Sequence, residues 1–263
     1  MSEKIDFDAR AAKAVEAMYL TPDVVGQRVA VLSALDLKPG ERVLDIGVGP
    51  GLLAEDAAKM VGAEGHVLGV DVSEAMITMA RTRCAALPQA AFTVCDAAKL
   101  DASAETFDAA VSTQVYEYVD DVPKALGDLF RVLKPGGRAL VLDTDWASVV
   151  WHSGDADLMR RVLSCWDAHL ADPHLPATLA PKLRRAGFRV QGVEVFPMMS
   201  VGYQPHSYAG GIMKAIHGFA RRNGEAHGLS ADEVQRWYDD QLRLAERGEF
   251  FFSLNRYQFL AGK

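Results

Sequence analysis

The sequence predicts an α/β protein built on a mostly parallel sheet, and three observations support this fold class. Short apolar runs of the length of buried strands alternate with stretches of helical periodicity, the rhythm of a parallel sheet with crossover helices. Of the 263 residues, 49% are hydrophobic and 24% are charged, which is typical of a globular protein. The chain shows no internal repeat or low-complexity tract. We therefore expect one continuous domain with a full core, rather than a disordered, fibrous or membrane-spanning chain.

Two helices are expected at the start of the chain, over residues 10–19 and 22–35. Pro22 suits the first turn of the second helix, because its missing N–H would have no helical partner there. An apolar stripe follows at helical spacing, formed by Val24, Val25, Val31, Leu32 and Leu35. A Lys-Pro-Gly turn at residues 38–40 then separates these helices from the first strand.

Five strands and their connecting helices follow. The strands are predicted at residues 42–46, 66–71, 91–95, 107–112 and 138–143. Helices are predicted from the loop after the first strand to about Val61, over residues 74–84 with Ser73 as N-cap, and over residues 123–133. Pro135 and Gly136 cannot continue the last of these helices. The link between the third and fourth strands is either a short helix or a bare loop.

The rest of the chain repeats this pattern more loosely. The expected elements are helices over residues 155–170 and 177–186, a sixth strand over 188–196 and a seventh over 250–261. Between the last two strands, a segment rich in Pro, Gly, Met and aromatic residues (197–212) precedes helical stretches around 213–222 and 230–247. A connection of this length in a compact domain is typical of a functional element.

The charge and the histidine spacing disfavour two classes of partner. The chain has 28 basic and 35 acidic residues, a formal net charge of −7, whereas a protein that binds nucleic acid through its phosphates needs a basic surface. The seven histidines show neither HxH nor HxxxH spacing, so no metal site is expected. The sequence thus predicts neither a nucleic-acid partner nor a metal.

The cysteines and the N-terminus favour the cytoplasm. Cys84, Cys95 and Cys165 lie far apart and form no CxxC pair, as expected for packing residues in a reducing compartment. The first residues are acidic and lack a signal pattern, and no run of 18 apolar residues could span a membrane. We expect a cytoplasmic protein.

A glycine loop follows the first strand and opens the next helix. Gly47, Gly49 and Gly51 allow a sharp turn and let a ligand approach where a Cβ would block it. Asp71 ends the second strand, 20 residues after Gly51, where a carboxylate accepts hydrogen bonds from ribose hydroxyls. Asp96 ends the third strand. These acidic residues meet at the carboxyl edge of the sheet, where open α/β folds bind ligands.

Two classes of cofactor fit this edge. A nicotinamide enzyme needs a small residue at position 52, where Leu52 stands. Asp45, two residues before the first glycine, would repel a pyrophosphate but attract a cationic ligand. The sulfonium and ammonium groups of S-adenosylmethionine therefore suit this loop better than a dinucleotide. An NAD(P)-dependent oxidoreductase and a non-catalytic S-adenosylmethionine-binding protein remain the alternatives.

Four motifs occur in order at the spacing of a known family. They are D-x-G-x-G-x-G at residues 45–51, Gly-Val-Asp-Val-Ser at 69–73, Cys-Asp-Ala at 95–97 and Leu-Lys-Pro-Gly-Gly at 133–137. Over roughly residues 36–145 the chain resembles the class I S-adenosylmethionine-dependent methyltransferases, and within them the small-molecule branch that includes the ubiquinone/menaquinone-biosynthesis enzymes. Val48 replaces the Cys or Thr that is frequent in the family loop.

The resemblance implies a Rossmann-like fold. Its sheet has seven mostly parallel strands with an antiparallel last strand and helices on both faces. We then expect a single methyltransferase domain over residues 1–263. Its parts are an N-terminal helical cap (1–35), a Rossmann-like core (36–196), a substrate-side insertion (197–249) and the last strand (250–263).

The resemblance also implies roles for individual residues. The glycine loop lies against the methionine part of S-adenosylmethionine, Asp71 with Val72 binds the ribose, and Asp96 meets the adenine amino group with Ala97 beside it. Thr113 and Gln114 line the methyl-transfer site. The expected cofactor-binding set is Asp45, Gly47, Gly49, Gly51, Asp71, Val72, Asp96, Ala97, Thr113, Gln114, Tyr19 and Arg28, and the product is S-adenosylhomocysteine.

Tyr19 and Arg28 belong to this set because the opening helices of the family often fold over the cofactor. The Arg28 fork can pair with the methionine carboxylate; the alternative is a solvated helix face. Gln27 is a further candidate on the same helix.

Catalytic and acceptor-binding residues are expected after the fifth strand and in the insertion. Asp145 and His152 are candidate bases for an acceptor hydroxyl or amine, unless they are hydrogen-bonded loop residues or transfer needs no base. Aromatic and methionine side chains of the insertion either wall an apolar acceptor pocket or pack the insertion on the sheet. Residues 255–257 either reach that pocket or pair within the sheet. We expect a small, apolar organic acceptor and a monomer or homodimer.

Overall fold

The computed structural model describes residues 9–263, and over this range the chain forms a seven-stranded sheet in the order β3-β2-β1-β4-β5-β7-β6. β7 is antiparallel to both of its neighbours, and the other paired strands are parallel. The strands are β1 (Arg42–Ile46), β2 (His66–Asp71), β3 (Ala90–Val94), β4 (Phe107–Thr113), β5 (Leu133–Trp151), β6 (Arg189–Val201) and β7 (Phe251–Gly262). The predicted Rossmann-like sheet with an antiparallel last strand is confirmed.

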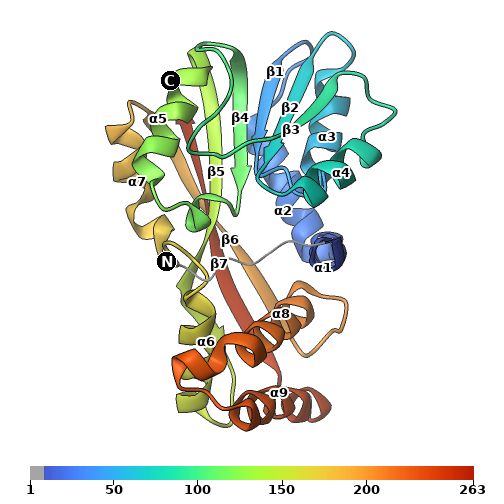
Figure 1. Cartoon of the computed structure of the whole chain (residues 1–263), viewed down its shortest axis with the longest axis vertical. Helices are drawn as coiled ribbons and strands as arrows, with labels where there is room; N and C mark the ends of the chain where they lie inside the picture. Colours follow the sequence, from blue (N-terminus) through green and yellow to red (C-terminus); the bar gives the residue numbers. More distant parts are fainter. Residues whose placement is uncertain (1–8) are drawn as a thin grey trace.

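Helices cover both faces of the upper sheet (Figure 1). One face packs against α2 (Pro22–Leu35), α3 (Leu52–Val61) and α4 (Glu74–Arg83), and the other against α5 (Val122–Val132) and α7 (Leu175–Arg185). Val43 and Leu44, adjacent on β1, are buried in opposite cores. Burial on both faces explains why this strand is a continuous apolar run.

The lower part of the molecule is a second layer of helices on an extension of the sheet (Figure 1). Its helices are α6 (Ala156–Asp167), α8 (Tyr208–Asn223) and α9 (Ala231–Glu246), with the short helix η2 (Gly224–His227) between the last two. They share one aromatic-rich core with the lower ends of β5, β6 and β7. We call this part the lower lobe.

The lower lobe corrects three predicted boundaries. The predicted strand end at Asp143 is wrong, because β5 continues to Trp151 along β7, which pairs Trp151 with Phe252. β6 likewise continues past residue 196 to Val201. α8 begins at Tyr208 rather than at residue 213, since the Ser207 hydroxyl accepts from Gly210 N and caps it.

Two further elements complete the description. α1 (Ala9–Tyr19) packs against α2, α4 and α8, and a single 3₁₀ turn, η1 (Tyr116–Tyr118), follows β4. The connection from β3 to β4 holds turns and no helix, which settles the alternative in favour of a loop. Within residues 9–263, no helix combines the length and the hydropathy needed to cross a bilayer.

Candidate functional site

The glycine loop wraps the carboxyl end of β1. Gly47 and Gly49 have positive φ angles of 69° and 53°, and Gly47 N donates to Val70 O on the neighbouring strand at 2.7 Å. A Cβ on Gly47 would lie 2.1 Å from Val115 Cγ2, whereas a Cβ on Gly49 would meet nothing closer than 4.0 Å. The loop is therefore packed against the protein at Gly47 and open at Gly49, where a ligand can approach.

Asp71 connects this loop to the end of β2. Its Oδ2 accepts from Gly49 N at 3.0 Å and its Oδ1 from Ser73 N at 2.9 Å. Burial raises the pKa of the Asp71 carboxyl, and these backbone hydrogen bonds oppose the rise. The carboxylate is thus held in a fixed orientation and keeps lone pairs for a ligand hydroxyl.

Asp45 lies beneath the same loop. Its side chain is 3% exposed, and Oδ2 has no hydrogen-bond partner within residues 9–263. Burial, with a contribution from the Asp71 carboxylate, raises the pKa of Asp45 to about 8. An unpaired buried carboxyl is unfavourable unless a ligand completes its hydrogen bonds, so this oxygen marks a place for a donor group, above all a cationic one.

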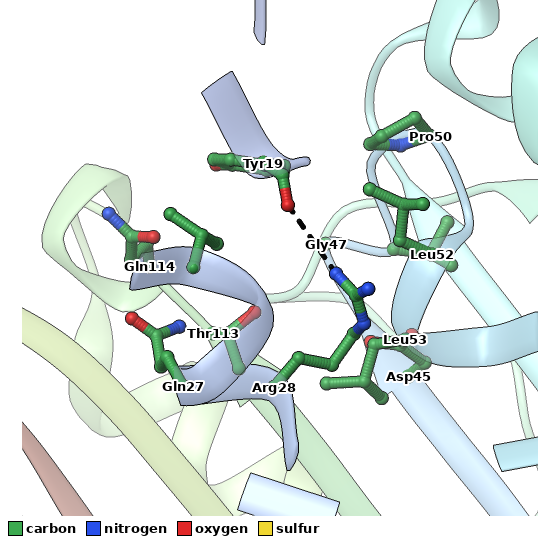
Figure 2. A pocket seen from close by; sticks show the side chains of 12 residues that line it. Tyr19, Gln27, Arg28, Asp45, Gly47, Pro50, Leu52, Leu53, Thr113 and Gln114 are labelled. Carbon is green, nitrogen blue, oxygen red and sulfur yellow. Dashed lines mark hydrogen bonds between the residues drawn. The ribbon is translucent and has the colours of Figure 1, made fainter. Parts of the chain in front are cut away.

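A small cavity joins the loop to the N-terminal helices (Figure 2). We call it the glycine-loop pocket; it is lined by Tyr19, Val24, Gln27, Arg28, Asp45, Gly47, Val48, Pro50, Leu52, Leu53, Thr113 and Gln114. Its volume is about 50 Å³, enough for one or two water molecules. A nucleoside-sized ligand must therefore also use the open surface beside the loop or displace part of α1 and α2.

Tyr19 and Arg28, the cofactor-binding candidates from the opening helices, both line this pocket. Arg28 Nε pairs with Asp56 Oδ2 on α3 at 2.9 Å, and its Nη1 donates to the Tyr19 carbonyl at 3.5 Å (Figure 2). Burial raises the pKa of the Tyr19 hydroxyl to about 12. Both side chains thus close the pocket from the helical side.

The residues expected to hold the nucleoside lie along the exposed edge beside the pocket. Val72 is 69% exposed, Ala97 is buried, and Asp96 is exposed with its Oδ1 accepting from Ala98 N at 2.8 Å. β2 and β3 are paired in parallel as far as Asp71 and Val94. These residues therefore emerge at the same edge as the glycine loop, outside the enclosed volume.

Gln114 follows β4 in an unusual backbone conformation. Its φ is +59°, in the left-handed region, and its N donates to Leu142 O at 2.6 Å. Its Nε2 lies 3.5 Å from Thr144 Oγ1 on β5. Such strain in a non-glycine residue is typical of functional sites, and here it brings Thr113 and Gln114 to the pocket wall.

The structure does not bring the two predicted bases to the pocket. Asp145 lies on the α7 face of β5, where its Oδ1 accepts from Ala147 N and contacts His174 Nδ1 at 3.3 Å. His152 follows the extended end of β5, and its Nδ1 lies 2.9 Å from Glu249 O in the lower lobe. Because β5 does not end at Asp143, the expectation that both residues lie at the reacting edge is wrong.

A group of buried polar side chains lies behind the pocket, and sequence reasoning missed two of them, Glu117 and Thr144, while it offered Arg256 only within residues 255–257. Its members are Glu117 on η1, Thr144 on β5, Tyr208 on α8 and Arg256 on β7. Arg256 Nη1 donates to Gln27 Oε1, and Glu117 Oε2 accepts from Thr144 N at 3.2 Å. We call this group the polar cluster. One signal was available: Arg256 shares its strand face with Phe252 and Leu254, so its period-two position predicts an inward side chain.

Fold and site together define a Rossmann-like domain whose glycine loop and acidic side chains meet at the carboxyl edge of the sheet. A family model described as "Methyltransferase domain" matches residues 43–137, the span from β1 through the Pro-Gly-Gly turn at the start of β5. Within residues 9–263, no three His, Cys, Asp or Glu side chains group so as to hold a metal ion.

Curated relatives extend the match beyond this span. A 2-phytyl-1,4-naphtoquinone methyltransferase of Thermosynechococcus vestitus is 31% identical over 183 residues, covering 63% of this chain and 79% of the relative. An uncharacterized 37.1 kDa protein of transposon TN4556 from Streptomyces fradiae is 32% identical over 236 residues, 88% of this chain. The chain spans only 65% of that relative, and 47% of a Synechococcus elongatus 2-phytyl-1,4-naphtoquinone methyltransferase that is 43% identical over 109 residues. The chain belongs to the S-adenosylmethionine-dependent methyltransferase family.

A solved structure shows the same fold. Phosphoethanolamine N-methyltransferase 2 of Haemonchus contortus, in complex with S-adenosyl-L-methionine, aligns with a TM-score of 0.63 and 23% identity. The alignment covers 98% of this chain and 57% of that one. The likeness therefore extends over the lower lobe as well as the sheet.

Proposed function

We propose that the protein transfers the methyl group of S-adenosylmethionine to a small organic acceptor. One observation carries the proposal: the buried, unpartnered Oδ2 of Asp45 lies beneath a glycine loop whose outer N–H group is held by Asp71. A cationic nucleoside supplies both a positive donor for Asp45 and ribose hydroxyls for Asp71. A dinucleotide also has ribose hydroxyls, but its pyrophosphate would bring negative charge rather than a positive donor to Asp45. The similarities above give no support to an oxidoreductase.

The residues present fit this cofactor. Asp45 would accept from its ammonium group and Asp71 from its ribose hydroxyls, while Gly49 leaves room for close approach. Arg28, already placed in the pocket by Asp56, would meet the carboxylate of the methionine part. The remaining predicted members of the set are Gly47, Gly51, Val72, Asp96, Ala97, Thr113, Gln114 and Tyr19.

The chain promotes transfer by alignment and by excluding water. S-adenosylmethionine, when bound, supplies an activated methyl group. Tyr19 and Gln114 both line the pocket and limit where an acceptor can lie, and correct alignment supplies much of the rate enhancement. Asp145 and His152 are directed elsewhere, so we propose that they are not the bases of this reaction.

The lower lobe supplies the acceptor side of the proposed site. Tyr208, Phe196 and Met198 belong to its aromatic core near the polar cluster. Methyltransferases of naphthoquinones among the relatives support a ring-shaped, largely apolar acceptor. The expected cytoplasmic location, the monomeric or homodimeric state and the division of the domain at residues 36, 197 and 250 remain proposals.

Calorimetry with S-adenosylmethionine, S-adenosylhomocysteine and NADH tests the cofactor. We expect both S-adenosyl compounds to bind and NADH not to bind. Absence of S-adenosylhomocysteine binding at high micromolar concentration would overturn the proposal. Tight cofactor binding without S-adenosylhomocysteine production from any of a panel of hydroxylated and quinone-type rings would favour the non-catalytic alternative.

A further inference from the structure

Arg256 has an unused hydrogen-bonding edge inside the protein, next to the glycine-loop pocket. Its side chain is fully buried, and its Nη1 donates to Gln27 Oε1, whose residue lines that pocket. Its Nε and Nη2 are buried and have no hydrogen-bond partner of normal geometry within residues 9–263, although the guanidinium also interacts with the Tyr208 hydroxyl. Leaving charged donors buried and unpaired is strongly unfavourable, so this edge indicates a ligand.

The two unpartnered nitrogens lie on the same edge of the guanidinium group. Nε–H and one N–H of Nη2 point in parallel, and their spacing matches the two oxygens of a carboxylate. A single carbonyl or hydroxyl oxygen would pair well with only one of them. The edge is therefore selective for a planar anion with two acceptor oxygens.

Neighbouring side chains hold the guanidinium plane in place. Its Cζ lies 4.5 Å from the centre of the Tyr208 ring, a cation–π contact, and Gln27 holds its opposite end. On β5, Thr144 is the register partner of Arg256 and contacts Gln114 of the pocket wall. Because the group is oriented in advance, little freedom is lost when a ligand binds.

No carboxylate of the described chain neutralises Arg256. Glu117 interacts with it electrostatically, but the two form no ion pair, and Glu117 Oε2 accepts from Thr144 N instead. Burial and the Asp143 carboxylate raise the pKa of Glu117, and the Arg256 charge offsets this only in part. The guanidinium thus has no ion-pair partner within the described chain.

We propose that Arg256 binds a carboxylate group of the methyl acceptor, with Nε and Nη2 each donating to one oxygen. This inference rests on the proposed function and narrows its substrate to the class of small ring-bearing acids.

Matched pairs of acids and amides test this assignment. Acetate, benzoate and 1-naphthoate, each beside its neutral amide, are titrated calorimetrically into the full chain saturated with S-adenosylhomocysteine. We expect at least one carboxylate to bind about tenfold or more tightly than its amide, as two charge-assisted hydrogen bonds predict. Arg256→Met removes this preference; it is titrated at saturating S-adenosylhomocysteine, because Gln27, the partner of Arg256, lines the cofactor pocket. Arg256→Lys keeps the charge without the fork and retains only part of the preference.

Arg28→Met is the matched control, because it removes an arginine from the pocket and not from the polar cluster. It weakens S-adenosylhomocysteine binding and, at saturation, preserves the carboxylate preference. The assignment is wrong if no carboxylate is preferred by the wild-type chain, or if the preference survives in Arg256→Met. Should that variant not fold, Arg256→Lys makes the comparison. If S-adenosylhomocysteine does not bind at all, the proposed function fails, and the titrations without it still decide the role of Arg256.

Discussion

Asp45 is the last residue but one of β1, Asp71 ends the neighbouring parallel strand β2, and the carboxylate of Asp71 adds to the burial that raises the pKa of Asp45. Asp71 has backbone hydrogen bonds on both oxygens, whereas Asp45 Oδ2 has none. Without a ligand, the Asp45 carboxyl keeps its proton up to a pH of about 8, and a cationic ligand must displace that proton.

We predict that S-adenosylhomocysteine affinity rises with pH up to about 8. Its ammonium group favours ionised Asp45, so the association constant should increase up to about tenfold per pH unit below the pKa of the free protein and level off above it. Calorimetry between pH 6 and 8.5, in buffers of different ionisation enthalpy, measures the affinity and the proton released. A profile that is equally steep in Asp45→Asn would show that another group is responsible.

Asp45→Asn should make the protein more stable while it weakens cofactor binding. The folded-state pKa of about 8 lies above the ordinary value of 3.8, so the contribution of Asp45 to stability is greatest at low pH and is lost as the pH rises through 8. The melting temperature of Asp45→Asn should exceed that of the wild type by about 2 °C or more at pH 8.5, and by less at pH 5.

Asp108→Asn is the control for this pH dependence. Burial of Asp108 is outweighed by the hydrogen bond from Lys134, which lowers the pKa of that carboxyl. The ionised Asp108 carboxylate therefore stabilises the folded protein fully at pH values well above 3.8, and this stabilisation is lost only in acid. The variant should melt lower than the wild type by the same amount at pH 5 and 8.5. A growing gap at high pH for Asp108→Asn would undermine the electrostatic account of Asp45.

Asp71→Ala should weaken S-adenosylhomocysteine binding by about 1–3 kcal/mol, because it removes the ribose acceptor and releases Gly49 N. Asp71→Asn keeps one acceptor oxygen and should lose less. Asp101→Ala, on the exposed connection to β4, should bind normally. Calorimetry at pH 7.5 measures all three, and wild-type affinity in Asp71→Ala would exclude Asp71 from the site.

The upper sheet and the glycine loop were predictable from sequence for a physical reason. β1 and β2 are buried on both faces, so they form apolar runs bounded by turn residues, and the structure places them at the predicted residues 42–46 and 66–71. Asp45 and Asp71 stand at fixed places relative to these strands. Their side chains therefore reach the carboxyl edge whatever the rest of the chain does.

The lower lobe and the polar cluster were not predictable in the same way. The extension of β5 begins after Asp143 with Thr144 and Asp145, and the two aspartates have low strand propensity and are typical of a loop. They are in a strand because β7, more than a hundred residues later, pairs with them. Glu117 has no periodic signal at all. Its burial depends on long-range contacts that a local pattern does not contain.

Gly47→Ala should destabilise the protein through two separable causes. Its φ of +69° is unfavourable for alanine by about 1–2 kcal/mol, and its Cβ would lie 2.1 Å from Val115 Cγ2, a clash that adds about 1–3 kcal/mol. In a Val115→Ala background only the backbone cause remains. The free energy of unfolding lost on Gly47→Ala should therefore be smaller there, by the contribution of the clash. Urea denaturation of the four proteins in this cycle measures the difference.

Gly49→Ala tests the backbone cause alone, without a clash. Its φ is also positive, but a Cβ there would meet nothing within 4.0 Å except Gly47 O. We expect a loss of about 1 kcal/mol that Val115→Ala does not change, together with weaker S-adenosylhomocysteine binding because the new methyl group occupies the open side of the loop. If Gly47→Ala were as mild as Gly49→Ala in both backgrounds, Val115 would not be packed against the loop. The rigid placement of the glycine loop over Asp45 would then need another cause.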